Sequence, residues 1–211
     1  MFIVLEGIDG CGKTTQADAI ERWIAARCGA GVVVRTHEPG GWPGGEALRA
    51  FLLADGFRSR WTEFLLFMAD RCEHAARVIS PALADGRIVL CDRYTPSTLA
   101  YQILSDLDIP KETTAYLLDM AQVLGLPEPD LVLWLDAPWE TAAARLVSRG
   151  KRDAFDARGR EYFERVRAAY GRLAAEAGGR TLWVPIDASH AQDDVFREIT
   201  GKLAAFLEGA A

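Results

Sequence analysis

The sequence predicts an α/β protein of three layers, in which a five-stranded parallel sheet is covered by helices on both faces. Short apolar runs rich in β-branched residues alternate with longer segments of helical spacing, and this alternation is typical of right-handed crossovers between parallel strands. A glycine-rich turn joins the first apolar run directly to the first helical segment. There is no internal repeat and no low-complexity linker, so residues 1–211 are expected to form a single domain.

Each expected strand is a short apolar run, which suits a strand that is buried on both faces of a parallel sheet. In chain order, the expected strands are Phe2–Glu6, Val32–His37, Ile88–Asp92, Leu131–Asp136 and Thr181–Ile186. Between them, apolar residues recur at the spacing of an α-helix. The expected helices are Lys13–Cys28, Arg60–Leu83, Thr113–Leu124, Glu140–Val147, Arg160–Ala177 and Gln192–Leu207.

The turn after the first strand reads GIDGCGKT from Gly7 to Thr14 and fits the P-loop pattern G-x-x-x-x-G-K-[ST] without a gap. The backbone N–H groups of such a turn hold phosphate oxygens, and glycine lets the backbone approach them closely. The helix N-terminus adds the positive end of a dipole. We expect Lys13 to reach the outer phosphates of a nucleotide and the Thr14 hydroxyl to ligate Mg²⁺. The alternative is a glycine-rich turn that binds nothing.

Two segments interrupt the regular order. Glu38–Gly45 (EPGGWPGG) is dense in glycine and proline and is expected to be a turn-rich loop. Ser148–Arg160 (SRGKRDAFDARGR) is strongly charged. It is either a solvated loop or a mobile lid that binds phosphate, because the basic residues Arg149, Lys151 and Arg152 cluster within it.

A charged pair ends the third expected strand. Asp92 can orient Mg²⁺ and its water molecules, and Arg93 can hold a second phosphate through bidentate hydrogen bonds. A structural ion pair between the two is the alternative. The base-reading element N-K-x-D of GTPases is absent, and the signature segment and greater length of transporter ATPases are not found either.

Composition narrows the class of protein further. Half of the residues are apolar, which is enough for a substantial core, and the formal net charge of −6, with no basic tract, argues against a nucleic-acid polymer as partner. The cysteines show no C-x-x-C spacing, and the histidines are scattered. With no signal peptide and no long apolar span, the expected location is the cytoplasm, with reduced thiols and no membrane contact.

Several ordered motifs resemble those of thymidylate kinases, the nucleoside-monophosphate kinases that convert dTMP to dTDP. The resemblance runs through nearly the whole chain, and Asp92–Gln102 (DRYTPSTLAYQ) is its most specific stretch. The other motifs are Phe2–Thr15 (FIVLEGIDGCGKTT), Glu38–Gly41 (EPGG), Gly45–Glu46 before Leu48–Arg49, Leu65–Arg71 (LLFMADR) and Phe163–Tyr170 (FERVRAAY).

The resemblance implies a P-loop kinase domain with ATP and Mg²⁺ as its cofactors. The residues implied to bind ATP are Gly7, Ile8, Asp9, Gly10, Cys11, Gly12, Lys13, Thr14 and Thr15. Thr14 and Asp92 would ligate the metal. The residues implied to take part in catalysis are Lys13, Asp92, Arg93, Arg149 and Arg152, with a lid at about 148–160.

The resemblance also implies a site for dTMP in the regions of about 38–75 and 92–102. The implied contact residues are Asp9, Arg49, Phe67, Arg71, Arg93, Ser97, Tyr101 and Gln102. Phe67 would stack on thymine, Arg71 and Gln102 would read its edge, and Tyr101 would crowd a ribose hydroxyl. Asp9 would accept the sugar 3′-hydroxyl, while Arg93 and Arg49 would hold the phosphate. Taken without the motifs, Phe67 could be a core residue, and the charged residues could belong to the solvated surface.

The sequence departs from the family pattern at two places. Trp42 stands where a small hydroxyl residue usually follows EPGG. The lid reads Asp153-Ala154-Phe155-Asp156 and lacks the usual arginine after the first aspartate, so the arginine that meets the transferred phosphate is not identified.

Two other functions stay open at this stage. The first is another P-loop nucleotide or deoxynucleoside kinase, which would need a carboxylate base near a 5′-hydroxyl, and Glu38 is the obvious candidate. The second is a module that binds a nucleotide in order to regulate a partner. The family resemblance also implies a homodimer formed through helices that include Arg60–Leu83.

Overall fold

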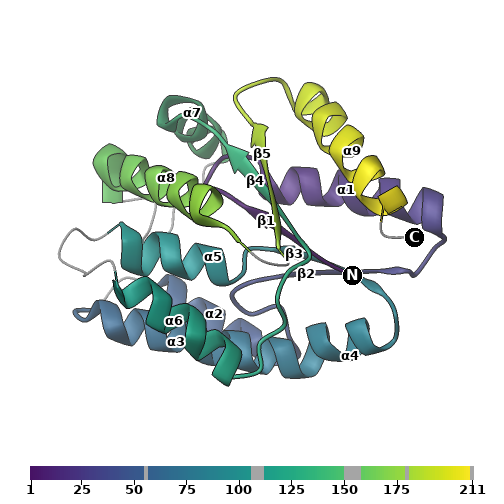
Figure 1. Ribbon diagram of the computed structural model, residues 1–211. Helices are drawn as coiled ribbons and strands as arrows, with labels where there is room; N and C mark the ends of the chain where they lie inside the picture. Colours follow the sequence, from purple (N-terminus) through teal and green to yellow (C-terminus); the bar gives the residue numbers. More distant parts are fainter. Residues whose placement is uncertain (55–56, 106–111, 150–157, 179–180, 210–211) are drawn as a thin grey trace.

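The computed structural model describes residues 1–54, 57–105, 112–149, 158–178 and 181–209. Within these ranges the chain forms a five-stranded parallel sheet with helices on both faces (Figure 1). The strands are β1 (Phe2–Glu6), β2 (Val33–His37), β3 (Ile88–Asp92), β4 (Leu131–Asp136) and β5 (Leu182–Asp187). Their spatial order is β2-β3-β1-β4-β5, and every neighbouring pair is parallel.

Helices connect these strands as crossovers, and the last helix follows β5. They are α1 (Lys13–Cys28), α2 (Gly45–Leu53), α3 (Arg60–His74), α4 (Ser80–Ala84), α5 (Thr95–Thr98), α6 (Glu112–Val123), α7 (Trp139–Arg149), α8 (Gly159–Glu176) and α9 (Gln192–Gly209), with two π-helical segments, η1 (Ala75–Ile79) and η2 (Leu99–Leu104). The predicted fold class is therefore confirmed. None of the helices within the described ranges is both long and apolar enough to cross a bilayer.

The two faces of β1 have separate apolar cores. All five residues of β1 are buried. Because side chains alternate along a strand, Ile3 and Leu5 belong to the core that includes α1 and α9. Phe2 and Val4 belong to a second core that includes residues of η1 and α4. Burial on both faces explains why the sequence of this strand is apolar from Phe2 to Leu5.

Most of the expected elements begin and end within two residues of their predicted bounds. Three differences have an identifiable structural reason. The last strand is Leu182–Asp187 rather than Thr181–Ile186, because the Leu182 N–H pairs with the Asp130 carbonyl and the Ala188 N–H with that of Asp136. The expected helix Arg60–Leu83 is divided by η1. Helix α2 and the helical segment α5–η2 were not expected as helices, since glycine and proline flank or interrupt both.

Candidate active site

The carboxyl ends of β1 and β3 lie side by side and bring the P-loop next to Asp92. Leu5 of β1 pairs with Asp92 of β3. Thr14, in the first turn of α1, donates a hydrogen bond from Oγ1 to Asp92 Oδ2 over 2.8 Å. Both side chains offer the oxygen ligands that Mg²⁺ prefers. The described residues hold no cluster of three or more His, Cys, Asp or Glu side chains suited to a metal, so Mg²⁺ at this place would take its other ligands from phosphate and water.

The P-loop packs so closely against two other segments that side chains are excluded from it. A Cβ atom on Gly7 would lie 2.4 Å from the carbonyl oxygen of Leu135, and one on Gly10 would lie 2.3 Å from that of Ala142. Both glycines have positive φ angles, 138° and 83°. The glycines of the motif therefore satisfy a steric requirement of the fold as well as leaving the loop backbone accessible to phosphate.

Lys13 is held by the P-loop itself. Its Nζ atom donates to the carbonyl oxygens of Gly7 and Ile8, each at 3.0 Å, and the residue is only 6% exposed. These carbonyl contacts place the ammonium group inside the curve of the loop that is predicted to hold the phosphates.

One cavity brings together all eight side chains that the sequence analysis proposed as contacts of dTMP. It contains about 550 Å³ of empty space including its open mouth. Asp9 and Arg93 lie where the cavity meets the P-loop. Asp9 is part of the P-loop, and Arg93 directly follows β3. The lining residues are Asp9, Glu38, Pro39, Arg49, Leu53, Phe67, Arg71, Arg93, Ser97, Thr98, Tyr101 and Gln102.

Arg93 is held in this cavity by several acceptors. Among the described residues it is the one non-glycine residue with a positive φ angle, 74°, a conformation that costs free energy and persists where contacts enforce it. Its Nη1 atom donates to the Gly7 carbonyl oxygen at 3.1 Å and to Ser97 Oγ at 3.0 Å, and its Nη2 atom pairs with Asp9. Burial is the largest single influence and would lower the pKa of Arg93, but the combined effect of Asp9 and other nearby acidic groups raises it.

Asp9 connects the P-loop with Tyr101. The Tyr101 hydroxyl donates to Asp9 Oδ2 at 3.0 Å and accepts from the Asp9 backbone N–H at the same distance. Burial would raise the pKa of Asp9, but the positive charges of Arg93 and Lys13 outweigh it, so the pKa is lowered. Asp9 is therefore a charged acceptor at the mouth of the P-loop.

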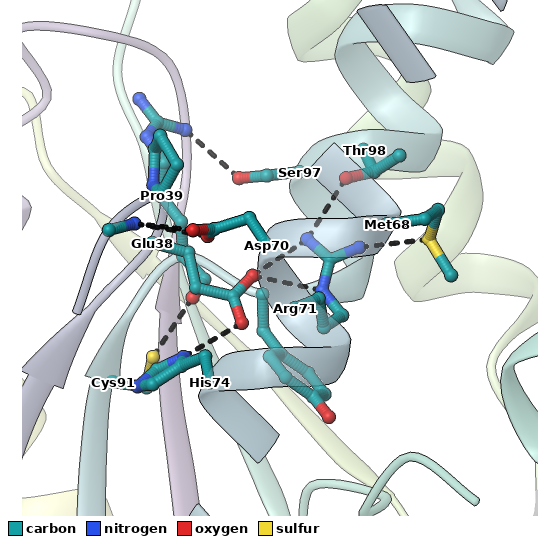
Figure 2. A network of polar contacts seen from close by, with 12 residues as sticks. Glu38, Pro39, Met68, Asp70, Arg71, His74, Cys91, Ser97 and Thr98 are labelled. Carbon is teal, nitrogen blue, oxygen red and sulfur yellow. Dashed lines mark hydrogen bonds and ion pairs between the residues drawn. The ribbon is translucent and has the colours of Figure 1, made fainter. Parts of the chain in front are cut away.

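Arg71 is fixed at the base of the cavity by Glu38. Its Nε atom donates to Glu38 Oε2 at 2.9 Å, and its Nη2 atom is 2.8 Å from the same oxygen and donates to Thr98 Oγ1 at 2.9 Å. The other oxygen of Glu38 contacts His74 Nδ1 at 2.9 Å. Figure 2 shows the Glu38 carboxylate between Arg71 and His74. Burial is the largest single influence and would lower the pKa of Arg71, but the charge and hydrogen bond of Glu38, together with Tyr94 and Glu6, raise it.

The Nη1 atom of Arg71 has a weaker partner. It lies 3.3 Å from the sulfur of Met68, and a thioether is a poor acceptor. Figure 2 shows this contact on the opposite side of the guanidinium group from Glu38. Arg71 can therefore offer a strong donor to a ligand without losing its ion pair.

Trp42, the departure from the family pattern, is part of the support for this loop. Its Nε1 atom donates to Asp70 Oδ1 at 2.8 Å. Asp70 also accepts from the Gly40 backbone N–H through both oxygens, each at 3.0 Å. Arg49, in α2, donates to the Pro39 carbonyl oxygen at 2.7 Å. The EPGG segment is thus tied to α3 on one side and to α2 on the other.

Gln102 and Phe67 line the cavity from two helices that face each other. Gln102, in η2, is 3% exposed, and its Nε2 atom donates to Glu63 Oε1 at 2.8 Å. Phe67 lies one helical turn after Glu63 in α3 and is half-buried.

Glu6 is a site residue that the sequence analysis missed. It is fully buried at the end of β1 and accepts from Ser97 Oγ at 2.6 Å, from the Tyr170 hydroxyl at 2.8 Å and from the Tyr94 backbone N–H at 2.9 Å. Burial raises the pKa of Glu6 and outweighs the nearby charge of Arg93. The available signal was a carboxylate that directly ends a fully apolar strand.

Arg145 was missed as well. From α7 it donates to the carbonyl oxygens of Cys11 at 3.2 Å, Ala188 at 2.9 Å and His190 at 3.0 Å. It therefore joins the P-loop to the loop that follows β5.

The lid residues cannot be placed in this site. Lys151 and Arg152 lie outside the described residues, and so does the side chain of Arg149, although its backbone ends α7. The proposed catalytic roles of Arg149 and Arg152 stay predictions.

The fold and the site define a P-loop nucleotide-binding protein with a second, arginine-containing cavity at the same edge of the sheet. Comparison with known proteins gives the family. A family model described as thymidylate kinase matches residues 5–199. The chain belongs to the thymidylate kinase family, which confirms the resemblance inferred from the motifs.

Individual relatives match over almost the full chain. The thymidylate kinase of Cupriavidus metallidurans is 45% identical over 194 residues, which cover 92% of each chain. That of Pseudomonas putida is 41% identical over 213 residues, covering 99% of this chain and 97% of the relative. A crystal structure of thymidylate kinase from Ehrlichia chaffeensis is 29% identical and covers 97% of this chain and 98% of its own, with a TM-score of 0.75.

Proposed function

We propose that this protein transfers the γ-phosphoryl group of ATP to dTMP, giving dTDP and ADP in deoxythymidine nucleotide synthesis. Membership of the thymidylate kinase family supports the reaction. The structural observation that carries the proposal is a cavity, lined by Arg49, Phe67, Arg71 and Gln102, that meets the P-loop at Asp9 and Arg93. Such a cavity allows an acceptor phosphate to approach a P-loop nucleotide.

Catalysis in this site rests on positioning and on charge. The phosphate of dTMP is already anionic and needs no strong base. Arg93 is proposed to align the attacking phosphate oxygen, since a planar guanidinium can hold two oxygens at once. Lys13 is proposed to exchange its contacts with the loop carbonyls for contacts with the γ-phosphoryl group. Bound Mg²⁺, held through Thr14 and Asp92, would supply further positive charge at the phosphates.

The nucleoside end of dTMP is proposed to lie among the residues of η2 and α3. Phe67 offers an aromatic face to thymine, while Arg71 and Gln102 offer polar atoms to its edge. Asp9 is proposed to accept the 3′-hydroxyl. Tyr101, whose hydroxyl is bonded to Asp9, would then have its ring beside C2′, where it excludes a ribose hydroxyl.

The lid is proposed to supply a further arginine to the transferred phosphoryl group. Arg149 and Arg152 are the candidates rather than Lys151, because a guanidinium can bridge two phosphate oxygens. Replacement of either by alanine is expected to lower kcat with little change in KM for dTMP. Parental kcat in both single variants and in the double variant would restrict the lid to covering the site.

The proposal also covers the location, the partners and the oligomeric state of the protein. The four cysteines are free thiols, which fits the proposed location in the reducing cytoplasm. The partners proposed are dTMP and ATP, with no nucleic-acid polymer and no membrane. A homodimer is proposed through the side chains of α2 and α3, where Phe51, Trp61 and Leu65 are exposed.

No observation favours the deoxynucleoside kinase alternative. Its general base would be Glu38, but both oxygens of Glu38 are occupied by Arg71 and His74. A panel of dTMP, thymidine, dUMP and dCMP with ATP, followed by coupled detection of ADP, tests the proposal. We expect dTMP to have the highest kcat/KM. Preference for thymidine would support the alternative, and absence of ADP release with every monophosphate would favour a regulatory module.

A further inference from the structure

We propose that Glu63 is a specificity-determining positioning residue, which fixes the side-chain amide of Gln102 so that the cavity presents an acceptor to the base. The inference rests on the proposed function, because it concerns how the site distinguishes dTMP from dCMP. It is carried by a chain of hydrogen bonds from α8 through α3 to η2.

The contact between Glu63 and Gln102 fixes which end of the Gln102 amide faces Glu63. Glu63 is 7% exposed and Gln102 is 3% exposed, and the atoms in contact are Glu63 Oε1 and Gln102 Nε2, 2.8 Å apart. A carboxylate has acceptors only, whereas a carboxamide has a donor side and an acceptor side. The buried carboxylate therefore requires the Nε2 side of the amide, and Gln102 Oε1 is turned away from it.

Glu63 is itself held in place by Arg158, the residue before α8. Its other oxygen, Oε2, accepts from Arg158 Nη2 at 2.8 Å. Arg158 also donates from Nη1 to the Tyr162 hydroxyl at 2.9 Å, and that hydroxyl donates to the Tyr101 carbonyl oxygen at 2.9 Å. The carboxylate thus has a positive partner on one side and an amide donor on the other. Its orientation does not depend on a ligand.

Arg71 and Gln102 both line the cavity and can contact the same base. Arg71 can only donate, and among the described residues the partner of its Nη1 atom is a thioether. With Gln102 Oε1 directed toward the base, the pair offers one donor and one acceptor. Thymine presents a carbonyl oxygen and a ring N–H, which match this pair. Cytosine presents an amino group and an unprotonated ring nitrogen, which do not.

The structure predicts a specific effect of Glu63→Gln. Arg158 would keep the Oε1 atom of the new side chain as its acceptor, so that the new Nε2 atom faces Gln102. Gln102 would then turn its own Oε1 toward α3 and its Nε2 toward the base. The ratio of kcat/KM for dTMP to that for dCMP should fall at least about tenfold, the order expected when a buried donor or acceptor loses its match.

Two comparisons separate this role from general damage to the site. The dTMP to dUMP ratio should stay at the parental value, because uracil presents the same polar edge as thymine. The double variant Glu63→Gln, Gln102→Glu places the acceptor-only group on η2 and should recover the dTMP to dCMP ratio. Glu63→Ala, which leaves the amide unfixed, should lower the ratio in the same way and serves if Glu63→Gln does not fold.

Failure of the role of Glu63 and failure of the proposed kinase function give different results in these assays. A parental dTMP to dCMP ratio in a folded Glu63→Gln or Glu63→Ala protein overturns the role of Glu63 but leaves the kinase assignment intact. An equal fall of the dTMP to dUMP ratio, or no recovery in the double variant, also overturns it. If the parent protein does not phosphorylate dTMP, both the inference and the proposed function are wrong.

Discussion

At the scale of single residues, Lys13 is proposed to exchange its carbonyl partners for the phosphates of a nucleotide. In Lys13→Ala we expect kcat to fall by at least about 10²–10³-fold, the magnitude typical of removing one group that stabilises charge in a transition state. The fold should tolerate the change, because within the described residues the hydrogen bonds of the ammonium group are all with atoms of the P-loop itself. Turnover assays together with thermal unfolding check this. Near-parental turnover by the folded variant would remove Lys13 from the mechanism.

Glu6 provides a pH prediction at the same scale. Burial raises its pKa from the usual 4.5 in the folded state. Stability contributed by a group with a raised pKa is complete below the unfolded pKa and is lost as the pH rises through the folded pKa. As the pH rises from about 4 to about 8, the parent should lose stability that Glu6→Gln does not lose. The free energy of unfolding of Glu6→Gln should therefore increase relative to that of the parent.

Denaturant unfolding at a series of pH values measures this difference for Glu6. Glu6→Gln also loses an acceptor for Ser97 and Tyr170, which lowers its free energy of unfolding. This loss does not follow the titration of the Glu6 carboxyl group. Glu46→Gln is the matched control, since Glu46 is exposed. A difference between Glu6→Gln and the parent that is constant across the pH series would show that the buried carboxylate does not titrate as described.

At the scale of elements, the loop between β2 and α2 depends on Trp42. Trp42→Phe keeps an aromatic ring, although a smaller one, but removes the Nε1 donor to Asp70, which also anchors Gly40. Loss of a hydrogen bond to a charged group is expected to cost about 1–3 kcal/mol of unfolding free energy. The KM for dTMP should rise more than kcat falls, because this loop connects to Arg49, which lines the cavity.

Trp23→Phe is the control for Trp42→Phe. Both tryptophans carry an arginine against the ring, Arg27 on Trp23 and Arg77 on Trp42, but Trp23 lies on α1 away from the cavity lining. Steady-state kinetics and thermal unfolding of the two variants make the comparison. Equal effects on the KM for dTMP would show that Trp42 acts only through general stability.

At the scale of the whole molecule, strands and long helices could be predicted because their signal is local. Phe2–Glu6, Lys13–Cys28 and Ile88–Asp92 have the same bounds in the structure as in the prediction. Helix α2 could not be predicted as well, because a helix of nine residues after a glycine-rich loop owes its stability to packing against α3. An element whose stability depends on packing against its neighbours therefore cannot be predicted from its local sequence.

The same limit applies to the candidate site. The eight proposed contact residues do line one cavity, since motifs give residue types and positions. The partners that orient them could not be predicted, because Glu38 is 33 residues from Arg71 and Glu63 is 39 residues from Gln102. Hydrogen bonds over such separations are set by how α3 packs against η2 and against the loop after β2.

The proposed homodimer is also a property of the whole molecule. Leu65, Phe51 and Trp61, on the adjacent helices α2 and α3, are 59%, 56% and 47% exposed. Exposed apolar side chains grouped on neighbouring helices are typical of a protein–protein interface. In sedimentation experiments we expect a dimer for the parent and a monomer for Leu65→Asp, because an unpaired charge would be buried in the interface. Val123→Asp is the control, since Val123 is 86% exposed on α6 and should leave the mass unchanged. A parental mass for Leu65→Asp would place any interface elsewhere on the molecule.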